Sequence, residues 1–385
     1  MDLVHLIVYL LCFLMRFHGA QGELSISEEE DLEFENQLNA LNKPPLKTIM
    51  GEAGDVFDCI DIHKQPAFDH PILKNHSFQM APTSMPEGFS SKSLAANNES
   101  NEVLESMDCR HGTVPIRRTR KEDLIRAKSV SHLSSINAQP QSARFPGQHR
   151  AMFKLYQPSN PTSIYRGVYG IMNVYNLRVE PGQSTSAQMW AENENGAETD
   201  TIQFGWRSNA NGKKRGCFNL LCAGFVQVNR KYPVGSAITG NSVYDGPQYE
   251  IGFWLFQDKN TGDWWLGNAD LTIIYGYWPK SLFPHLTQGA NVVAWGGLVK
   301  AGPNGISPPM GSGYFEDGKF EHSGYFRNIE IVDGRYNRAD INFYKLIPIF
   351  DAPNCYTAEN VNAFKKSKEN GYIIMYGGAG GKCGM

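Results

Sequence analysis

Residues 249–266 read YEIGFWLFQDKNTGDWWL, and this stretch decides the fold class. From residue 249 to 256, Tyr, Ile, Phe and Leu alternate with Glu, Gly, Trp and Phe, which is the two-residue period of a β-strand. Asp258–Gly262 carries turn residues, and Trp264–Leu266 begins a second apolar run. The stretch therefore predicts an antiparallel β-hairpin.

Short runs of the same kind recur on both sides of this hairpin. We expect further strands at Gly167–Asn176, Ser184–Trp190, Ala223–Val228, Leu271–Tyr277, Asn291–Val299, Tyr325–Val332 and Tyr372–Tyr376. The chain has 385 residues with 38 Gly, 12% aromatic and only 19% charged residues, which suits turns and strands more than exposed helices. From about residue 149 onward the sequence predicts an all-β, antiparallel sandwich or barrel.

The region before residue 149 has a different character. Ser27–Glu30 is a capping box that opens a helix ending before Pro44-Pro45, and Thr119–Glu122 is a second capping box, which opens a helix through Ala127. Pro-rich turns and a polar stretch, Ser90–Ser106, lie between them. Two N-glycosylation sequons begin at Asn75 and Asn98, which favours an exposed segment.

Basic residues cluster between 117 and 128 (Arg117, Arg118, Arg120, Lys121, Arg126 and Lys128). They indicate either a solvated helix entry or an exposed processing region between a pro-segment and a mature domain. Residues 130–148 are rich in Ser, Gln and Pro and have the composition of a linker.

The first 22 residues predict the compartment. Leu3–Met15 is an apolar run followed by Arg16 and the small residues Gly19, Ala20 and Gly22, the pattern of a secretory signal peptide. An uncleaved anchor is the alternative; no later stretch is apolar enough to cross a bilayer. The net charge of −3 and pI of about 6.4 give no reason to expect a nucleic acid or an anionic membrane as partner. We expect a secreted, extracellular protein.

The cysteine count fits an oxidising compartment. Removal of Cys12 with the signal leaves six cysteines, and sequential pairing is the simplest of about 15 connectivities. A metal site is the alternative, but Cys-x2-Cys pairs with nearby His are missing, so we expect neither metal nor cofactor. The predicted disulfides are Cys59–Cys109, Cys217–Cys222 and Cys355–Cys383.

An ordered series of motifs resembles the plant secreted neprosin family. Residues 41–45, 58–61, 64–71 and 113–119 resemble its activation peptide. Its catalytic domain is matched at Gln188–Trp190, Ile202–Trp206, Gly216–Cys222, Gly224–Gln227, Gly276–Pro279, Trp295–Gly297 and Pro308–Gly313. After the signal peptide at 1–22, the resemblance implies a mixed pro-segment at 23–143 and a two-sheet β-sandwich of the glutamic-peptidase (jelly-roll) type at 149–385. It also implies that the chain's own pro-segment blocks the groove until it is removed in acid.

Members of the family are acid endopeptidases, best known for cleavage at proline, with two glutamates on the concave face of the sandwich. One carboxylate takes the proton of the attacking water, and the second group stabilises the oxyanion. In this chain the two glutamate positions hold Gln203, within Ile202–Trp206, and Leu298, directly after Trp295–Gly297. Glutamine keeps hydrogen-bonding capacity, but leucine cannot act as a base.

Strand parity places Leu298 on one face with Gly296 and Ala294, and Gln203 on the face opposite Ile202 and Phe204. The alternative for Leu298 is an ordinary core leucine with the register shifted by one.

The segment 207–215 is shorter than in the family, which predicts a missing or re-routed strand beside the Gln203 position. Asp200 shares no face with that position, and Glu192, Glu194 and Glu198 are interpreted as loop acids. His285 and His322 stand without a Ser or Cys arrangement.

Two functions follow. The first is a catalytically degenerate glycoprotein that binds a peptide or a cell-wall polymer. Its candidate platforms are Trp190, Trp206, Trp254, Trp264, Trp265 and Trp295, although we expect most of these in the core. The alternative is an active acid endopeptidase that cleaves at proline.

Overall fold

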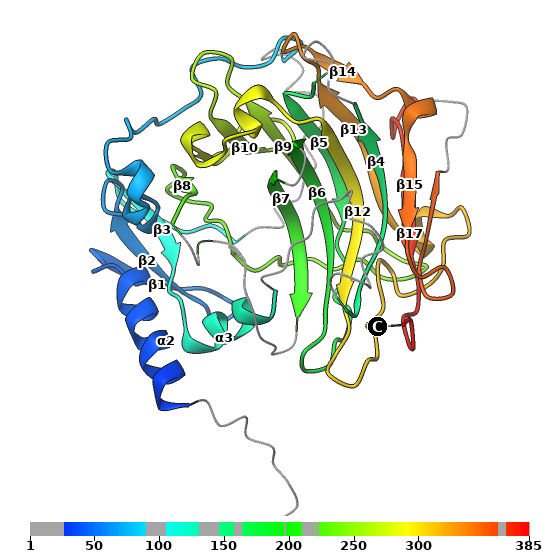
Figure 1. Cartoon of the computed structure of the whole chain (residues 1–385), viewed down its shortest axis with the longest axis horizontal. Helices are drawn as coiled ribbons and strands as arrows, with labels where there is room; N and C mark the ends of the chain where they lie inside the picture. Colours follow the sequence, from blue (N-terminus) through cyan, green and yellow to red (C-terminus); the bar gives the residue numbers. More distant parts are fainter. Residues whose placement is uncertain are drawn as a thin grey trace, which may run out of the picture.

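The computed structural model describes residues 27–89, 105–130, 146–157, 164–195, 198–209, 220, 223–360 and 367–384. Within these ranges the strands form three antiparallel sheets, of three, nine and five strands. The two larger sheets face each other as a sandwich (Figure 1). The predicted all-β sandwich, preceded by a mixed segment, is confirmed.

The five-stranded sheet carries the two family positions. Its order is β15-β4-β12-β6-β7, so strands from both ends of the domain meet in it. The strands are β4 (Gln148–Tyr156), β6 (Ser184–Asn195), β7 (Glu198–Asn209), β12 (Val292–Lys300) and β15 (Ile347–Phe350).

The nine-stranded sheet contains the hairpin predicted at residues 249–266. β9 (Glu250–Gln257) pairs with β10 (Trp264–Asn268), with Gln257 opposite Trp264, as the alternation predicts. The order is β16-β17-β13-β5-β9-β10-β11-β8, with β14 paired to β13. The other strands are β5 (Gly167–Asn173), β8 (Val226–Gln227), β11 (Ile274–Trp278), β13 (Gly324–Val332), β14 (Arg338–Asp340), β16 (Thr357–Asn360) and β17 (Ile374–Gly377).

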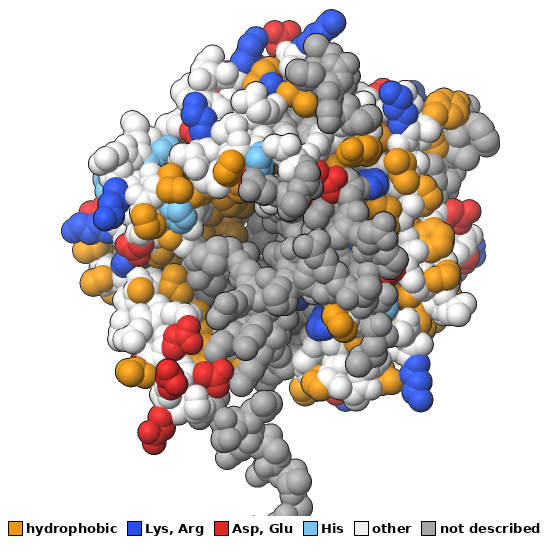
Figure 2. Space-filling model, in the orientation of Figure 1, with side chains coloured by type: hydrophobic (Ala, Val, Ile, Leu, Met, Phe, Trp, Pro, Cys, Tyr) orange, Lys and Arg blue, Asp and Glu red, His pale blue; other side chains and the backbone are white. Residues whose placement is uncertain are grey.

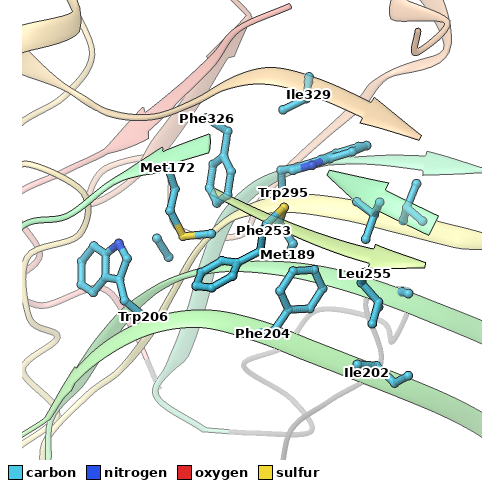
Figure 3. Packing of buried hydrophobic residues seen from close by; sticks show 14 of the residues in the cluster. Met172, Met189, Ile202, Phe204, Trp206, Phe253, Leu255, Trp295, Phe326 and Ile329 are labelled. Atoms are coloured by element: carbon cyan, nitrogen blue, oxygen red, sulfur yellow. The ribbon is translucent and has the colours of Figure 1, made fainter. Parts of the chain in front are cut away.

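The main core lies between the two sheets. Phe204 and Trp206 of β7 and Met189 of β6 meet Phe253 of β9 and Trp295 of β12, and all five side chains are buried (Figure 3). The Trp295 indole N–H donates to the carbonyl of Tyr169 at 2.8 Å, so its one polar group is satisfied inside the core. Full burial of each such side chain stabilises the fold by about 1.5–3 kcal/mol.

The N-terminal segment is the described residues between 27 and 130, and its residues 27–61 and 105–130 form a small unit beside the sandwich (Figure 1). It contains α2 (Glu28–Leu41), β1 (Lys47–Met50), β2 (Val56–Asp61), β3 (Thr113–Arg117) and α3 (Lys121–Val130). Ser27 caps α2 by accepting from the Glu30 N–H at 3.2 Å, as predicted. Acidic side chains of the first turn of α2 gather at the lower left of Figure 2. Their negative charge stabilises the helix, because the N-terminal end of the helix dipole is positive.

The start of α3 differs from the expected position. The Arg120 N–H donates to the Asp123 carboxylate at 2.9 Å, so Arg120 precedes the helix and Asp123 supplies the capping oxygen. The predicted cap, Thr119, instead donates its N–H to the Asn42 side chain at 2.8 Å. The helix itself is confirmed, but its cap comes from the third helical residue.

Residues 62–89 of the N-terminal segment cover the outside of the nine-stranded sheet. Ala67 lies in one apolar cluster with Trp254, Trp265 and Tyr277, and Phe68, Phe78 and Phe89 pack against that cluster. The Phe89 ring meets the Trp254 ring edge-on, with centroids 4.7 Å apart.

Short 3-10 helices lie in residues 62–89 and in the sandwich loops: η1 (Pro66–Asp69), η2 (Pro71–Leu73), η4 (Lys280–Leu282), η5 (Leu286–Gln288), η6 (Phe320–His322) and η7 (Phe343–Lys345).

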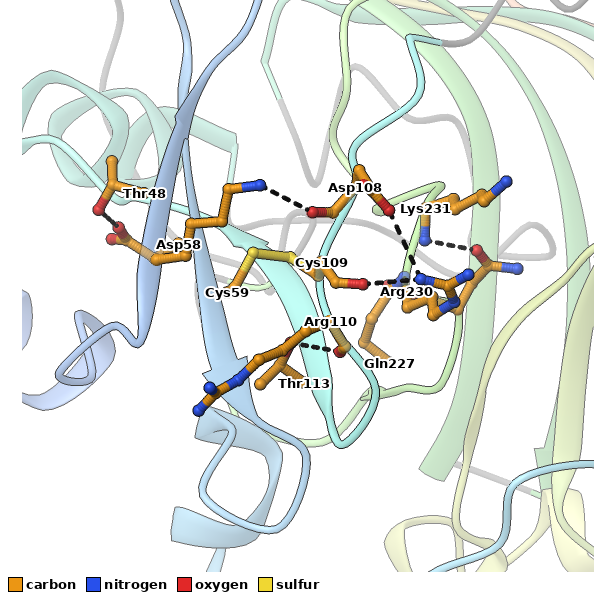
Figure 4. The surroundings of a disulfide bond; sticks show 12 residues. Thr48, Asp58, Cys59, Asp108, Cys109, Arg110, Thr113, Gln227, Arg230 and Lys231 are labelled. Atoms are coloured by element: carbon orange, nitrogen blue, oxygen red, sulfur yellow. Dashed lines mark hydrogen bonds and ion pairs between the residues drawn. A yellow bond between two sulfur atoms is a disulfide. The ribbon is translucent and has the colours of Figure 1, made fainter.

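A disulfide between Cys59 and Cys109 joins β2 to the segment that precedes β3, residues 105–112 (Figure 4). Next to it, the Cys109 N–H donates to the carbonyl of Arg230 at 3.3 Å, and the Arg230 guanidinium donates back to the Cys109 carbonyl at 3.0 Å. The bridge therefore stabilises both the small unit and its contact with the sandwich.

The second disulfide in the described residues joins Cys355 and Cys383, as predicted. Cys217–Cys222, the 1–22 signal region and Asn98 lie outside the described residues. Asn75 is exposed just after η2. No helix in the described part of the chain is both long enough and apolar enough to span a membrane.

Candidate functional site

The outer face is the side of the five-stranded sheet directed away from the nine-stranded sheet. Gln203 of β7 lies opposite Trp190 of β6, and Leu298 of β12 lies opposite Ser186 of β6. Both belong to this face, because their strand neighbours Phe204 and Val299 are buried in the inter-sheet core. Leu298 is therefore not a leucine of the main core, and its expected parity holds.

The sheet does not bring Gln203 and Leu298 directly together. Trp190 of β6 pairs with both Gln203 of β7 and Ala294 of β12, so Gln203 and Ala294 lie at the same height in the sheet. Leu298 lies four residues further along β12, and β6 separates β12 from β7. With ordinary strand spacing and rise, their Cα atoms lie about 16 Å apart. Gln188 occupies the middle of this diagonal, opposite both Gly205 and Gly296.

The two glycines beside Gln188 have conformations that disfavour any side chain. Gly205 has φ +148°, and a Cβ there would lie 2.1 Å from the carbonyl oxygen of Ala187. Gly296 has φ +156°, and a Cβ there would lie 2.4 Å from the carbonyl oxygen of Ala151. The Gln188 side chain is consequently flanked by bare backbone on both neighbouring strands.

Leu298 lies against a small apolar cluster on the outer face. The cluster consists of Met152, Trp190, Val292 and Ala294, with Leu298 and Ile349 packed against it. This environment stabilises an apolar side chain, although the two strand partners of Leu298 on the same face, Arg150 of β4 and Ser186 of β6, are polar.

Glu192, a carboxylate predicted to lie in a loop, is on this same face. Glu192 belongs to β6, is fully buried, and accepts a hydrogen bond from the Thr201 hydroxyl at 2.8 Å. The loop interpretation is wrong for Glu192, Glu194 and Glu198, because β6 extends to Asn195, five residues beyond the expected end, and β7 begins at Glu198. Apolar alternation stops at Trp190, and this hid the rest of the strand.

Basic groups accompany Glu192. Burial lowers the pKa of Arg150 to about 10, although the charges of Asp351 and Glu192 oppose the shift. Burial also lowers the pKa of Lys154, against the charges of Glu194 and Glu192. Glu192 is thus one member of an ionic group that spans β4 and β6, the two strands on either side of β12.

Two family models match the chain. The model for neprosin matches residues 181–379, and that for the neprosin activation peptide matches residues 48–155. The chain belongs to the neprosin family. The neprosin match runs from just before β6 to just after β17, and it includes the positions of Gln203 and Leu298. The activation-peptide match includes β1 to α3 and extends into β4.

Other residues singled out from the sequence have structural roles. Asp200 points away from the outer face and accepts the N–H groups of His285 and Leu286 at 2.6 and 3.0 Å. His322 contacts two carboxylates, Asp317 at 2.7 Å and Asp245 at 3.2 Å. The described residues contain no group of His, Cys, Asp and Glu able to hold a metal ion.

The candidate tryptophan platforms are wrong as exposed binding surfaces. Trp206, the most exposed of the six, keeps only 6% of its surface exposed. Trp190 lies on the outer face but is itself only 2% exposed.

Proposed function

We propose that this neprosin-family protein is secreted, has lost the catalytic pair of its relatives, and binds an extended peptide on the outer face. The leucine at position 298 carries this proposal. It packs with Trp190 and Met152, and its side chain can neither accept a proton nor hydrogen-bond a water. A cell-wall polymer is the second ligand class to be tested.

Gln203 supports a loss of catalysis in which ligand binding is retained. Its amide can donate to an oxyanion or accept from a ligand N–H, but it cannot serve as a general base. Removing a general acid or base costs about 10²–10⁴ in rate, or roughly 3–5 kcal/mol of barrier.

Glu192 does not supply the missing base in this proposal. Its carboxylate is held by Thr201 and lies near Arg150, and it has no exposed surface through which a water could approach. Active peptidase chemistry through Glu192 is the alternative, favoured only by its position on the same face as Gln203.

The N-terminal segment, by this proposal, is a pro-segment. Its junction with the sandwich must precede Gln148, because β4 is an interior strand of the five-stranded sheet. The basic cluster at 117–128 runs from the end of β3 into α3, and Arg117 is bound to Asp55 and Asp123. Such pairing favours a structural role for Arg117, so we place the cut after α3. Asn75 is available for glycosylation in the same segment.

The test is a peptidase assay. The purified chain, before and after acid treatment, is incubated with proline-containing peptides, and binding of the same peptides is measured by calorimetry. We expect binding without turnover. The double substitution Gln203→Glu and Leu298→Glu is then compared with Gln203→Glu alone, and a gain of cleavage confined to the double variant supports loss of the pair.

Turnover by the unmodified chain that disappears in Gln203→Ala would refute the proposal. Turnover that disappears in Glu192→Gln would instead identify Glu192 as the base. Binding of cell-wall oligosaccharides without any peptide binding would replace the peptide by the polymer.

A further inference from the structure

Two tyrosine rings form an exposed aromatic surface at the end of the sandwich where β9 and β13 begin. Tyr244 lies in the turn before β9, and Tyr314 lies in the loop between β12 and β13. Their ring centroids are 4.2 Å apart, yet Tyr244 is 39% exposed and Tyr314 is 55% exposed. Phe315, also exposed, follows directly. Large apolar side chains that are exposed together, rather than singly, indicate a surface that contacts a ligand or a partner.

His322 holds this tyrosine surface in place. Its ring stacks on the Tyr244 ring, with centroids 4.6 Å apart and an angle of 18° between the planes. The His322 Nδ1 atom lies 2.7 Å from the Asp317 carboxylate, and the Nε2 atom lies 3.2 Å from the Asp245 carboxylate. Because both ring nitrogens have a carboxylate partner, the orientation of the imidazole and of the tyrosine stacked on it is set before any ligand binds.

The turn that carries Asp245 directs this carboxylate toward the tyrosine surface. Asp245 has φ 55°, in the left-handed region that residues other than glycine seldom occupy. Its N–H donates to the carbonyl of Glu321 at 2.9 Å, and the Val243 N–H closes the turn by donating to the carbonyl of Pro247 at 3.0 Å. Such backbone strain persists only where the surroundings maintain it. Here it keeps Asp245 beside His322 while 78% of the Asp245 side chain stays exposed.

The charge around the tyrosine surface is negative. Asp245, Asp317 and Glu321 are exposed in its two loops, residues 243–249 and 312–323. Lys319 is the one lysine or arginine in these loops, and His322, even when protonated, offsets a single carboxylate. The surface is therefore complementary to a cationic partner.

A tyrosine face beside an exposed carboxylate suits a guanidinium group. The planar guanidinium stacks on an aromatic ring and donates two parallel N–H groups to a carboxylate. An ammonium group is a compact and strongly hydrated charge, so it gains less from the ring. A sugar ring also stacks on tyrosine, but a neutral ligand is not attracted by the surrounding carboxylates.

We propose that Tyr244, Tyr314 and Asp245 bind an arginine side chain of a partner protein. The guanidinium lies on the tyrosine surface and donates to the Asp245 carboxylate. Phe315 and Val243, both exposed next to these residues in sequence, contact the apolar neighbours of that arginine. The site lies at the end of the sandwich and does not depend on ligand binding at the outer face.

The experiment compares three blocked pentapeptides that carry one arginine, one lysine or one citrulline between glycines. Citrulline keeps the shape of arginine but has no charge. Binding to the full chain is measured at low salt from the changes in the peptide NMR signals. The citrulline peptide should bind about tenfold more weakly than the arginine peptide, since it loses both the ring contact and the ion pair. The lysine peptide should bind about threefold more weakly.

The protein variants identify the binding residues. Tyr314→Ala and Asp245→Asn should each weaken the arginine peptide about threefold. Asparagine tolerates the left-handed conformation, so Asp245→Asn removes the charge and keeps the turn. Tyr344→Ala changes an exposed tyrosine of η7, and Asp108→Asn changes an exposed carboxylate of the N-terminal segment. Both are matched controls and should leave the affinity unchanged.

A second variant separates binding from packing. Tyr314→Leu fills much of the same space without an aromatic face, so it should weaken the arginine peptide as much as Tyr314→Ala does. Affinity that is retained in Tyr314→Leu would show that the ring supplies bulk only, and would overturn the proposal.

The remaining outcomes also decide the proposal. Equal binding of the arginine and citrulline peptides, or of the arginine and lysine peptides, overturns it. An equal loss in Asp245→Asn and Asp108→Asn would show attraction by net charge without a site. Binding of oligosaccharides alone, or no binding of any probe, refutes the assignment of arginine. Self-association of the chain that Tyr314→Ala abolishes would replace the partner protein by a second copy.

Discussion

Asp258 fastens the N-terminal segment to the nine-stranded sheet, and its removal should loosen that segment. The side chain is fully buried in the turn between β9 and β10. It accepts hydrogen bonds from the hydroxyls of Thr83 and Ser84, at 3.0 and 2.9 Å, and from the N–H groups of both residues. It also accepts the N–H groups of Asn260 and Thr261 within its own turn.

The expected cost of Asp258→Ala follows from these bonds. Each hydrogen bond to a charged group contributes about 1.5–3 kcal/mol, and neighbouring contributions are not additive. Because several buried donors lose their acceptor at once, we expect the free energy of unfolding to fall by about 3–5 kcal/mol. Asp258→Asn keeps one carbonyl oxygen and should cost about 1–3 kcal/mol.

The pH dependence has a definite sign. Burial by itself raises the pKa of Asp258, but the hydrogen bonds from Asn260, Thr261 and Ser84 outweigh burial and lower it. The stabilising contribution is therefore complete at pH above the ordinary value of about 4 and is lost as the pH falls through the lowered pKa. The pH-dependent part of the stability in this acid range should shrink in Asp258→Asn.

Two measurements check the prediction. Urea unfolding gives the change in free energy, and hydrogen exchange at the Thr83 and Ser84 amides reports whether the loss is local. Asp270→Ala is the matched control, since Asp270 accepts only from Thr272 in its own exposed turn. A loss below about 1 kcal/mol in Asp258→Ala, or unchanged exchange at both amides, refutes the reasoning.

Three further predictions concern other parts of the chain. Replacing Cys59 by Ser opens a loop with a sequence separation of 50 residues, which should cost about 4 kcal/mol by loop entropy in a denaturant titration; an unchanged midpoint would contradict this. Gly205→Ala drives a Cβ into a carbonyl of β6 and should cost about 2–4 kcal/mol in the same assay, with a loss of only a few tenths as the contrary result. Hydrogen bonding to Asp317 raises the pKa of His322, so its contribution is complete below about pH 6.5 and lost as the pH rises through the raised pKa. The melting temperature should therefore fall less on going alkaline in His322→Gln than in the unmodified chain.

The strands were predictable where the apolar alternation and the turn residues indicated the same bounds. In residues 250–257 the apolar alternation continues to the turn at Asp258, and the hairpin is found where it was expected. The small three-stranded sheet was missed. Its strands β2 and β3 are paired across the Cys59–Cys109 loop, and Pro115 lies within β3, which argues locally against a strand.

The outer face was predictable in part. Parity fixed the side on which Gln203 and Leu298 lie, since each neighbours an apolar residue that must enter the core. The register between strands was not predictable, because it depends on how β6 pairs with β7 and β12. For that reason the sequence indicated neither the central place of Gln188 nor the burial of Glu192.

The position of β4 has a consequence for how the protein is made. Its Arg150 N–H donates to the Asp351 carboxylate across a sequence separation of 201 residues, beside the pairing of β4 with β15. The five-stranded sheet therefore cannot be completed until β15 has left the ribosome. Pairing between strands so far apart in sequence is also slow. The small N-terminal unit, whose contacts are closer in sequence, can fold first. Residues 62–89 would then be available to cover the apolar outer side of the nine-stranded sheet before β15 completes the five-stranded sheet.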